Sequence, residues 1–147
     1  MRLRLLVVLA LAWTFGPAAA ADLPFKVLST GKVKGQVEAG LSEVRDQKTL
    51  VQTWSRMGLT RAVPKVNFKQ RMVVAWVGGG SACDKYVLAH VREDASDVVL
   101  EIERLRPPPG RMCILIFTPS QIVASIPLTG KPVRFNVPVG SGAMESR

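Results

Sequence analysis

Apolar and polar residues alternate through most of the chain after residue 70, and this two-residue period predicts β-strands. The segment 72–77 is apolar almost throughout, which is typical of a strand buried on both faces. Two shorter segments near the start of the chain show a weaker form of the same pattern. Together they predict strands over 25–29, 36–41, 72–77, 86–93, 98–105, 112–117, 122–126 and 133–137.

The alternation also predicts which side chains face the core. In 86–93 it places Val87, Ala89 and Val91 on one face, and His90 on the opposite face, where it would be a partly covered histidine with one hydrogen bond. In the last strand the inward side chains would be Val133, Phe135 and Val137.

The segment from Asp46 to Gly58 has the period of a helix instead. Asp46 is a favourable N-cap residue, and Gly58 suits a left-handed residue at the helix end. Apolar side chains recur between them at helical spacing, at Leu50, Val51, Trp54 and Met57. This apolar stripe predicts a helix that packs on the sheet, with Trp54 in the core.

Short turns join most of the predicted strands, such as the polar segment 94–97. Turns of this length imply antiparallel pairing, because a parallel crossover needs a dozen or more residues. The sequence therefore predicts a mainly β (α+β) fold: an antiparallel sandwich or open barrel of six to eight strands with one packing helix.

The first 21 residues have the order of a secretory signal peptide. Arg2 and Arg4 precede an apolar run over 5–15, and small residues at 18–21 follow it. The run is shorter than the roughly 20 residues that a membrane-spanning helix needs. We therefore expect a cleaved leader at 1–21, a single domain over 22–147, no membrane span in the mature form, and export to the periplasm or the medium.

Composition excludes several classes of protein. The chain has one His and two Cys, too few for a zinc finger or a multi-histidine metal site, so no cofactor is expected. The glycines at 78–80 lack the motifs of a nucleophile elbow or a phosphate loop, and no acid, base and nucleophile set is evident, which predicts that the protein is not an enzyme. The formal net charge of +9 comes from scattered residues. In an exported protein it predicts a basic surface and no nucleic-acid partner.

The two cysteines, Cys83 and Cys113, are expected to form a disulfide, because lone cysteine pairs usually oxidise in an exported domain. This bond would tie together two unusual segments, a glycine-rich one that reads as a flexible strand connection and a proline-rich cationic one. Loops fixed side by side are suited to recognition. The candidate partner-binding residues are Gly79, Gly80, Ser81, Asp84, Lys85, Tyr86, Arg106, Pro107, Pro108, Pro109, Gly110 and Arg111.

The order of several short motifs resembles the C-terminal domain of the protease complex subunit PrcB. They are Val66-Asn67-Phe68, Met72-Val73-Val74-Ala75, the glycine segment before Tyr86, Pro109-Gly110, Ile122-Val123-Ala124-Ser125-Ile126-Pro127 and Val133-Arg134-Phe135, within 41–138. Asn67 stands where the family tends to have Asp, and Cys83-Asp84-Lys85 replace its Thr-Gly-Gly. The resemblance implies an exported, non-catalytic accessory domain that assists a secreted protease or binds another exported protein.

Two alternatives remain open at this stage. Arg106-Pro107 and the glycine segment are similar to the paired loops of chagasin-like protease inhibitors, although the Thr-Thr-Gly element of those inhibitors is absent. The basic surface is also suited to an anionic envelope polymer or lipid.

Overall fold

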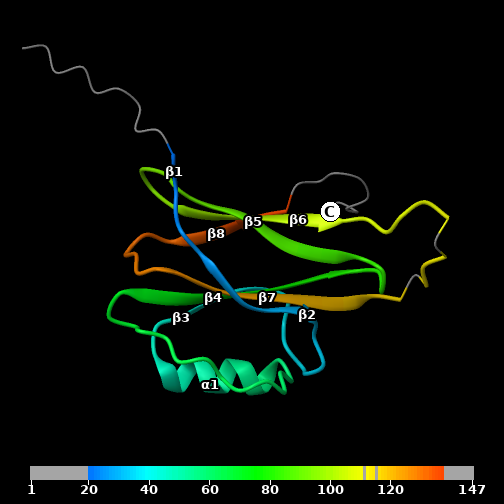
Figure 1. Ribbon diagram of the computed structural model, residues 1–147, viewed down its shortest axis with the longest axis horizontal. Coiled ribbons are helices and arrows are strands. Elements are labelled where there is room, and N and C mark those ends of the chain that lie inside the picture. Colours follow the sequence, from blue (N-terminus) through cyan, green and yellow to red (C-terminus); the bar gives the residue numbers. More distant parts are fainter. Residues whose placement is uncertain (1–19, 111, 115, 138–147) are drawn as a thin grey trace, which may run out of the picture.

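The computed structural model describes residues 20–110, 112–114 and 116–137. Two four-stranded sheets face each other, and one helix covers the outer face of the lower sheet (Figure 1). The strand orders are β1-β5-β6-β8 and β2-β7-β4-β3. The elements are β1 (Ala21–Asp22), β2 (Lys26–Lys32), β3 (Gly40–Val44), α1 (Gln47–Arg56), β4 (Arg71–Gly80), β5 (Lys85–Glu93), β6 (Val98–Leu105), β7 (Thr118–Pro127) and β8 (Val133–Asn136).

The predicted fold class is confirmed as a mainly β sandwich with one packing helix. One strand pair differs from the expected antiparallel arrangement, because β8 pairs with β6 in parallel. The chain leaves β7 in one sheet and enters β8 in the other, so β8 does not have to lie beside the strand that precedes it. No helix among the described residues is long and apolar enough to cross a membrane.

The helix α1 begins and ends where the sequence predicts. The Asp46 carboxylate accepts a hydrogen bond from the Thr49 amide at 2.8 Å and caps the first turn. Gly58, just after the helix, has a φ of 68°, which glycine adopts without steric cost. Trp54 is buried, and its indole Nε1 donates to the Arg61 carbonyl at 2.9 Å. The predicted core position of Trp54 is therefore confirmed.

The strand β4 separates two apolar clusters, because its alternate side chains point to opposite faces. Met72, Val74 and Trp76 belong to the cluster between the sheets. Val73, Ala75 and Val77 belong to the cluster beneath α1, with Leu50, Trp54 and Met57. The prediction of a strand buried on both faces is confirmed.

A strand predicted over 36–41 lies later in the structure. β3 spans Gly40–Val44 and pairs with residues 73–77 of β4, whereas 36–39 are irregular. Leu41 packs against the cluster between the sheets and Val37 against the cluster beneath α1, so both are partly buried although only Leu41 lies in the strand.

The predicted common face of Val87, Ala89 and Val91 holds only for Val91, because a register shift lies between Leu88 and His90. Such a bulge adds one residue and reverses the alternation beyond it. Tyr86, Leu88 and Val91 are therefore the buried residues, and His90 is exposed. In the last strand, Val133 and Val137 pack against the inter-sheet core as predicted, while the Phe135 ring lies 6.3 Å from Trp76 and stays 44% exposed.

The N-terminal strands connect the two sheets (Figure 1). β1 pairs with Arg92 and Glu93 at the end of β5, and the Leu23 amide still donates to the Val91 carbonyl at 2.8 Å. The chain then passes Pro24 and enters the other sheet as β2, which pairs with β7. β2 is consequently the edge strand of its sheet, and on the same side of the sandwich β5 has only the short strand β1 beside it.

Candidate partner-binding end of the sandwich

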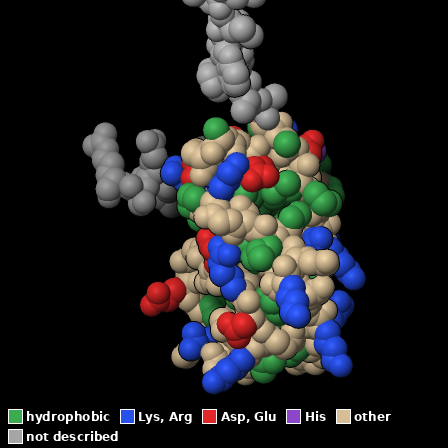
Figure 2. Space-filling view, turned by 90° about the vertical axis from the view of Figure 1, so that its left-hand side faces the viewer, with side chains coloured by type: hydrophobic (Ala, Val, Ile, Leu, Met, Phe, Trp, Pro, Cys, Tyr) green, Lys and Arg blue, Asp and Glu red, His purple; other side chains and the backbone are tan. Residues whose placement is uncertain are grey.

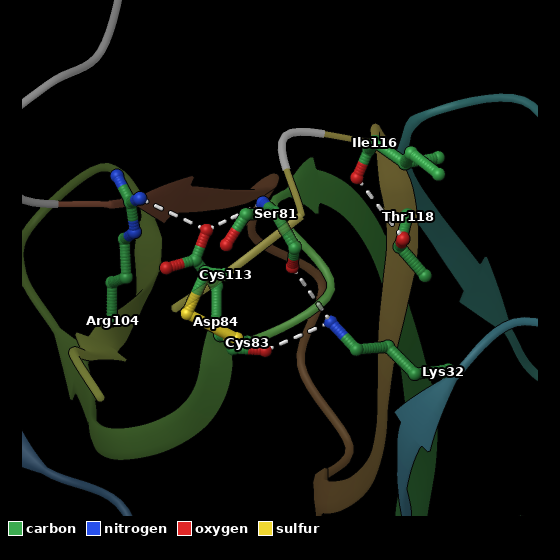
Figure 3. The surroundings of a disulfide bond; sticks show 8 residues. All are labelled: Lys32, Ser81, Cys83, Asp84, Arg104, Cys113, Ile116 and Thr118. Atoms are coloured by element: carbon green, nitrogen blue, oxygen red, sulfur yellow. Dashed lines mark hydrogen bonds and ion pairs between the residues drawn. A yellow bond between two sulfur atoms is a disulfide. The ribbon is translucent and has the colours of Figure 1, made fainter. Parts of the chain in front are cut away.

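The disulfide Cys83–Cys113 is present, as predicted, with the two Cα atoms 5.8 Å apart. It joins the turn between β4 and β5 to the long loop over 106–117, which connects β6 with β7 across the two sheets (Figures 1 and 3). We call this segment the 106–117 loop. A disulfide is compatible with an oxidising, exported environment.

The predicted flexible glycine connection at 78–80 is wrong. These glycines continue β4 and pair with residues 118–120 of β7. A Cβ atom on Gly79 would collide with the ring of Phe117, and one on Gly80 would meet the Asp84 carboxylate and the Tyr86 hydroxyl. The glycines are therefore explained by close approach of side chains to a strand, and not by a flexible turn.

Asp84 holds the turn that contains Cys83. Its side chain is 2% exposed, accepts a hydrogen bond from the Ser81 amide at 2.6 Å, and pairs with the Arg104 guanidinium at 2.9 Å (Figure 3). Burial by itself raises the pKa of the Asp84 carboxyl, but the hydrogen bonds from Arg104 and Ser81 and the charge of Arg104 outweigh it, so the pKa lies below its ordinary value. Asp84 thus fixes the turn from inside.

Lys32, which no sequence pattern indicated as a site residue, binds the same turn from the other sheet. Its Nζ donates to the carbonyls of Asp84 at 2.8 Å and Ser81 at 3.2 Å (Figure 3). It also donates to the Ser120 hydroxyl at 3.2 Å. All three ammonium donors are used, and all three acceptors are neutral. The turn is consequently attached to both sheets.

Tyr86 lies beneath the turn, in the core between the sheets. Its hydroxyl donates to the Gly79 carbonyl at 2.7 Å, and its ring lies 5.1 Å from the Trp76 ring. Burial raises the pKa of Tyr86 above its ordinary value. Tyr86 is therefore a structural anchor of the site.

The other predicted binding residues fall into two groups. Lys85 is exposed at the start of β5. Pro107 is half-buried, whereas Arg106, Pro108, Pro109 and Gly110 are exposed along the loop, where Gly110 makes a left-handed turn with a φ of 85°. Arg111 lies outside the described residues. The disulfide brings the two groups to the same end of the sandwich.

The strand predicted over 112–117 is absent from the described part of this segment, from which Leu115 is missing. The described residues of the segment have no neighbouring strand, and their large apolar side chains are mostly exposed. The exposed fractions are 97% for Met112, 67% for Ile114, 62% for Ile116 and 70% for Phe117. The apolar run is visible in the sequence, where it predicts a strand and not an exposed loop.

A groove of about 360 Å³ lies beside the disulfide, between residues 30–32 of β2 and 85–87 of β5. Apolar side chains contribute much of its wall, at Ala82, Val87 and Leu105. Leu105, at the end of β6, is 43% exposed. The groove and the 106–117 loop are thus neighbouring features of one end of the molecule.

Basic side chains are scattered over the opposite end of the sandwich, with acidic side chains between them (Figure 2). They do not form a single dense patch in that view, in line with the scattered charge of the sequence. Within the described ranges, no group of three His, Cys, Asp or Glu side chains could hold a metal ion.

Comparisons with family models, with curated proteins and with solved structures found no match to this chain. The resemblance to the PrcB C-terminal domain therefore stays a prediction.

Proposed function

We propose that this protein is an exported, non-catalytic binding domain that attaches to another exported protein through the 106–117 loop. The observation that carries the proposal is the exposure of Met112, Ile114, Ile116 and Phe117 on one connection. Soluble proteins rarely display large apolar side chains together unless the surface binds something. The accessory role implied by the PrcB resemblance agrees with a domain of this kind.

The 106–117 loop is restrained at two points, which supports a role in recognition. The disulfide holds the loop at Cys113, and Phe117 packs over Gly79 where the loop rejoins the sheet. Restricting a loop before binding lowers the entropy that association costs. A constrained loop with exposed apolar side chains is suited to anchor a complex, because its large side chains can fill pockets of the partner protein.

The charges near this end favour an acidic partner surface. Lys85 is exposed and has no ion pair among the described side chains, and Lys32 has only neutral acceptors. The one nearby buried carboxylate, Asp84, is already paired with Arg104. Rim charges of one sign act mainly on the association rate, so binding should weaken as salt increases.

The test is affinity capture from exported extract with matched variants. Ile114→Ser with Ile116→Ser removes apolar surface from the loop. As a control, Val51→Ser with Leu128→Ser removes partly exposed apolar surface elsewhere. We expect the loop variant to lose at least about tenfold in captured partner, and the control to capture as wild type. Equal capture by both variants would contradict the proposal.

A protease inhibitor is the second candidate, because the disulfide joins the turn between β4 and β5 to the 106–117 loop, and chagasin-like inhibitors use paired loops. Titration of cysteine and serine proteases with the mature protein separates the two functions. Stoichiometric inhibition that the loop variant abolishes would assign inhibition. Sedimentation with anionic vesicles and with an anionic polymer tests the remaining alternatives in the same series.

A further inference from the structure

The outer edge of β5 lacks a neighbouring strand over residues 85–89, within the described ranges. β1 begins to pair with this edge, and its last bond is the one from the Leu23 amide to the Val91 carbonyl. The next residue, Pro24, has no N–H to donate, and the chain crosses to the other sheet. The position that β1 would occupy beside residues 85–89 is therefore left without a strand.

The backbone groups on this edge can be assigned from one contact. The Thr30 hydroxyl donates to the Tyr86 carbonyl at 3.4 Å, so this carbonyl points away from β6 and toward β2. In an antiparallel pair, alternate residues direct their N–H and C=O groups to the same side. The N–H and C=O of Tyr86 and Leu88 consequently point outward. The shift after Leu88 makes Val91 the next outward residue, which agrees with its bond to Leu23.

The groove described above lies beside this edge, because Lys85, Tyr86 and Val87 line it. Its volume is within the lower part of the range of ligand pockets. Val87 and Leu105 provide apolar contact for a side chain that enters it. A strand placed beside β5 would direct every second side chain toward this groove, because strand side chains alternate.

The charges of the groove indicate the composition of its occupant. Lys32 and Lys85 line it, and neither has an ion pair with a described residue. The carboxylate of Asp84 is occupied by Arg104. The groove therefore complements a segment that carries both carboxylates and apolar side chains.

We propose that an extended segment of a partner polypeptide, in which acidic and apolar residues alternate, adds to β5 as an antiparallel strand opposite residues 85–89. Its backbone bonds to Tyr86 and Leu88, an apolar side chain enters the groove beside Leu105, and its carboxylates lie near Lys85 and Lys32. Main-chain bonds supply affinity and the groove supplies specificity in this mode of recognition. The proposal deepens the proposed function and rests on this being a binding domain, but it uses a different surface from the loop.

The probe is a panel of acetylated, amidated hexapeptides in which Glu alternates with Val, Leu, Ile or Phe, titrated into the isotope-labelled mature protein. We expect saturable binding and at least about tenfold slower amide hydrogen exchange at Leu88. Peptides N-methylated on the edge that faces β5 should not bind, whereas methylation of the opposite edge should leave binding unchanged. Three outcomes would overturn the proposal. They are the absence of saturable binding at millimolar peptide, equal binding of both methylated forms, and protection from exchange at β2 instead of Leu88.

Matched variants test the groove and the charge separately. Leu105→Asp should weaken peptide binding at least about tenfold, whereas Leu128→Asp, at a leucine of similar exposure, should not. Lys85→Glu should weaken binding and remove its salt dependence, whereas Lys26→Glu, at an exposed lysine outside the lining of the groove, should leave both unchanged. Indifference to both Leu105→Asp and Lys85→Glu would overturn the placement of the peptide.

The two proposals fail in different ways. If no peptide binds while the loop variant still loses its captured partner, strand addition is wrong and the binding function of the loop stands. If peptides bind at β5 while the loop variant captures as much partner as wild type, the binding function proposed for the loop is wrong and the edge site stands.

Discussion

Apolar side chains are buried beneath α1, whereas they are exposed at the disulfide end of the sandwich. α1 buries Leu50, Trp54 and Met57 against the lower sheet. The 106–117 loop leaves Met112 and Ile114 in solvent. Each segment connects or covers strands, and each contains several large apolar residues, yet only the first uses them to stabilise the fold.

The difference follows from how each segment is attached. α1 is held by its apolar stripe, assisted by the Asp46 cap and the Trp54 indole bond. The loop end is held by the disulfide and by polar contacts of Asp84 and Lys32 with the adjoining turn. Where covalent and polar contacts fix the backbone, apolar side chains are not required for folding and remain available for a partner. The following predictions test this division, from the largest expected effect to the smallest.

Trp54→Ala should lower the free energy of unfolding by about 3 to 5 kcal/mol, because truncation of a buried aromatic side chain leaves a cavity. It should leave partner capture unchanged for the protein that remains folded. Urea denaturation measures the loss, and Val51→Ala, on the exposed side of the same helix, is the control. A loss below about 1 kcal/mol would show that the helix is not held by its apolar stripe.

Cys83→Ser with Cys113→Ser should lower the free energy of unfolding by about 2 to 4 kcal/mol, since the bond closes a loop across a sequence separation of 30. Unlike Trp54→Ala, it should also weaken partner capture, because the loop loses its restraint. Mass analysis of the wild-type protein checks the premise: the mature form should have no thiol that can be alkylated. Unchanged capture by the double variant would separate binding from loop restraint.

Asp84→Asn should lower the free energy of unfolding by about 2 kcal/mol, because it removes the carboxylate that pairs with the Arg104 guanidinium. The pKa of Asp84 is lowered in the folded state, so its contribution is complete above its unfolded value of about 4 and is lost as the pH falls below that. Acid unfolding should therefore be less steep in the variant. Asp46 and Asp94, whose pKa values are also lowered, should preserve part of the acid sensitivity.

Met112→Ser and Ile114→Ser should each change the free energy of unfolding by no more than about 0.5 kcal/mol, because surface substitutions rarely do more. Their effect should fall on binding alone. Thermal denaturation and partner capture measured on the same preparations give the comparison. A loss of stability as large as that of Trp54→Ala would mean that the loop packs on the protein in solution.

The sequence predicted most of the strands, the helix with its cap, and the cysteine pair, because each depends on local periodicity or on the small number of cysteines. It did not predict the bulge in β5 or the parallel pairing of β8. A bulge changes the face of every later residue without any change in composition, and the neighbour of β8 depends on which sheet the chain enters after Pro127.

The candidate site was predicted only in outline. The two segments that meet at the disulfide were selected by their glycine, proline and charge. Two of the predicted residues, Asp84 and Tyr86, are buried and support the turn. Lys32 is distant in sequence, and only its contacts in the structure identify it as part of the site. The exposed residues Met112, Ile114, Ile116 and Phe117 lie in a segment that the sequence predicts as a strand, since an apolar run alone does not show whether a partner strand is available to cover it.

The position of β7 also governs the order in which the chain can fold. β7 lies between β2 and β4, so that Lys26 is opposite Ser125, and β2 has no other neighbour in its sheet. A chain synthesised from its N-terminus cannot complete this sheet until residues 118–127 have emerged. Pairings so distant in sequence make folding slow, in the range of milliseconds to seconds. β2 consequently remains unpaired for most of synthesis, and during this interval it is accessible to chaperones, whereas β3 can already pair with β4.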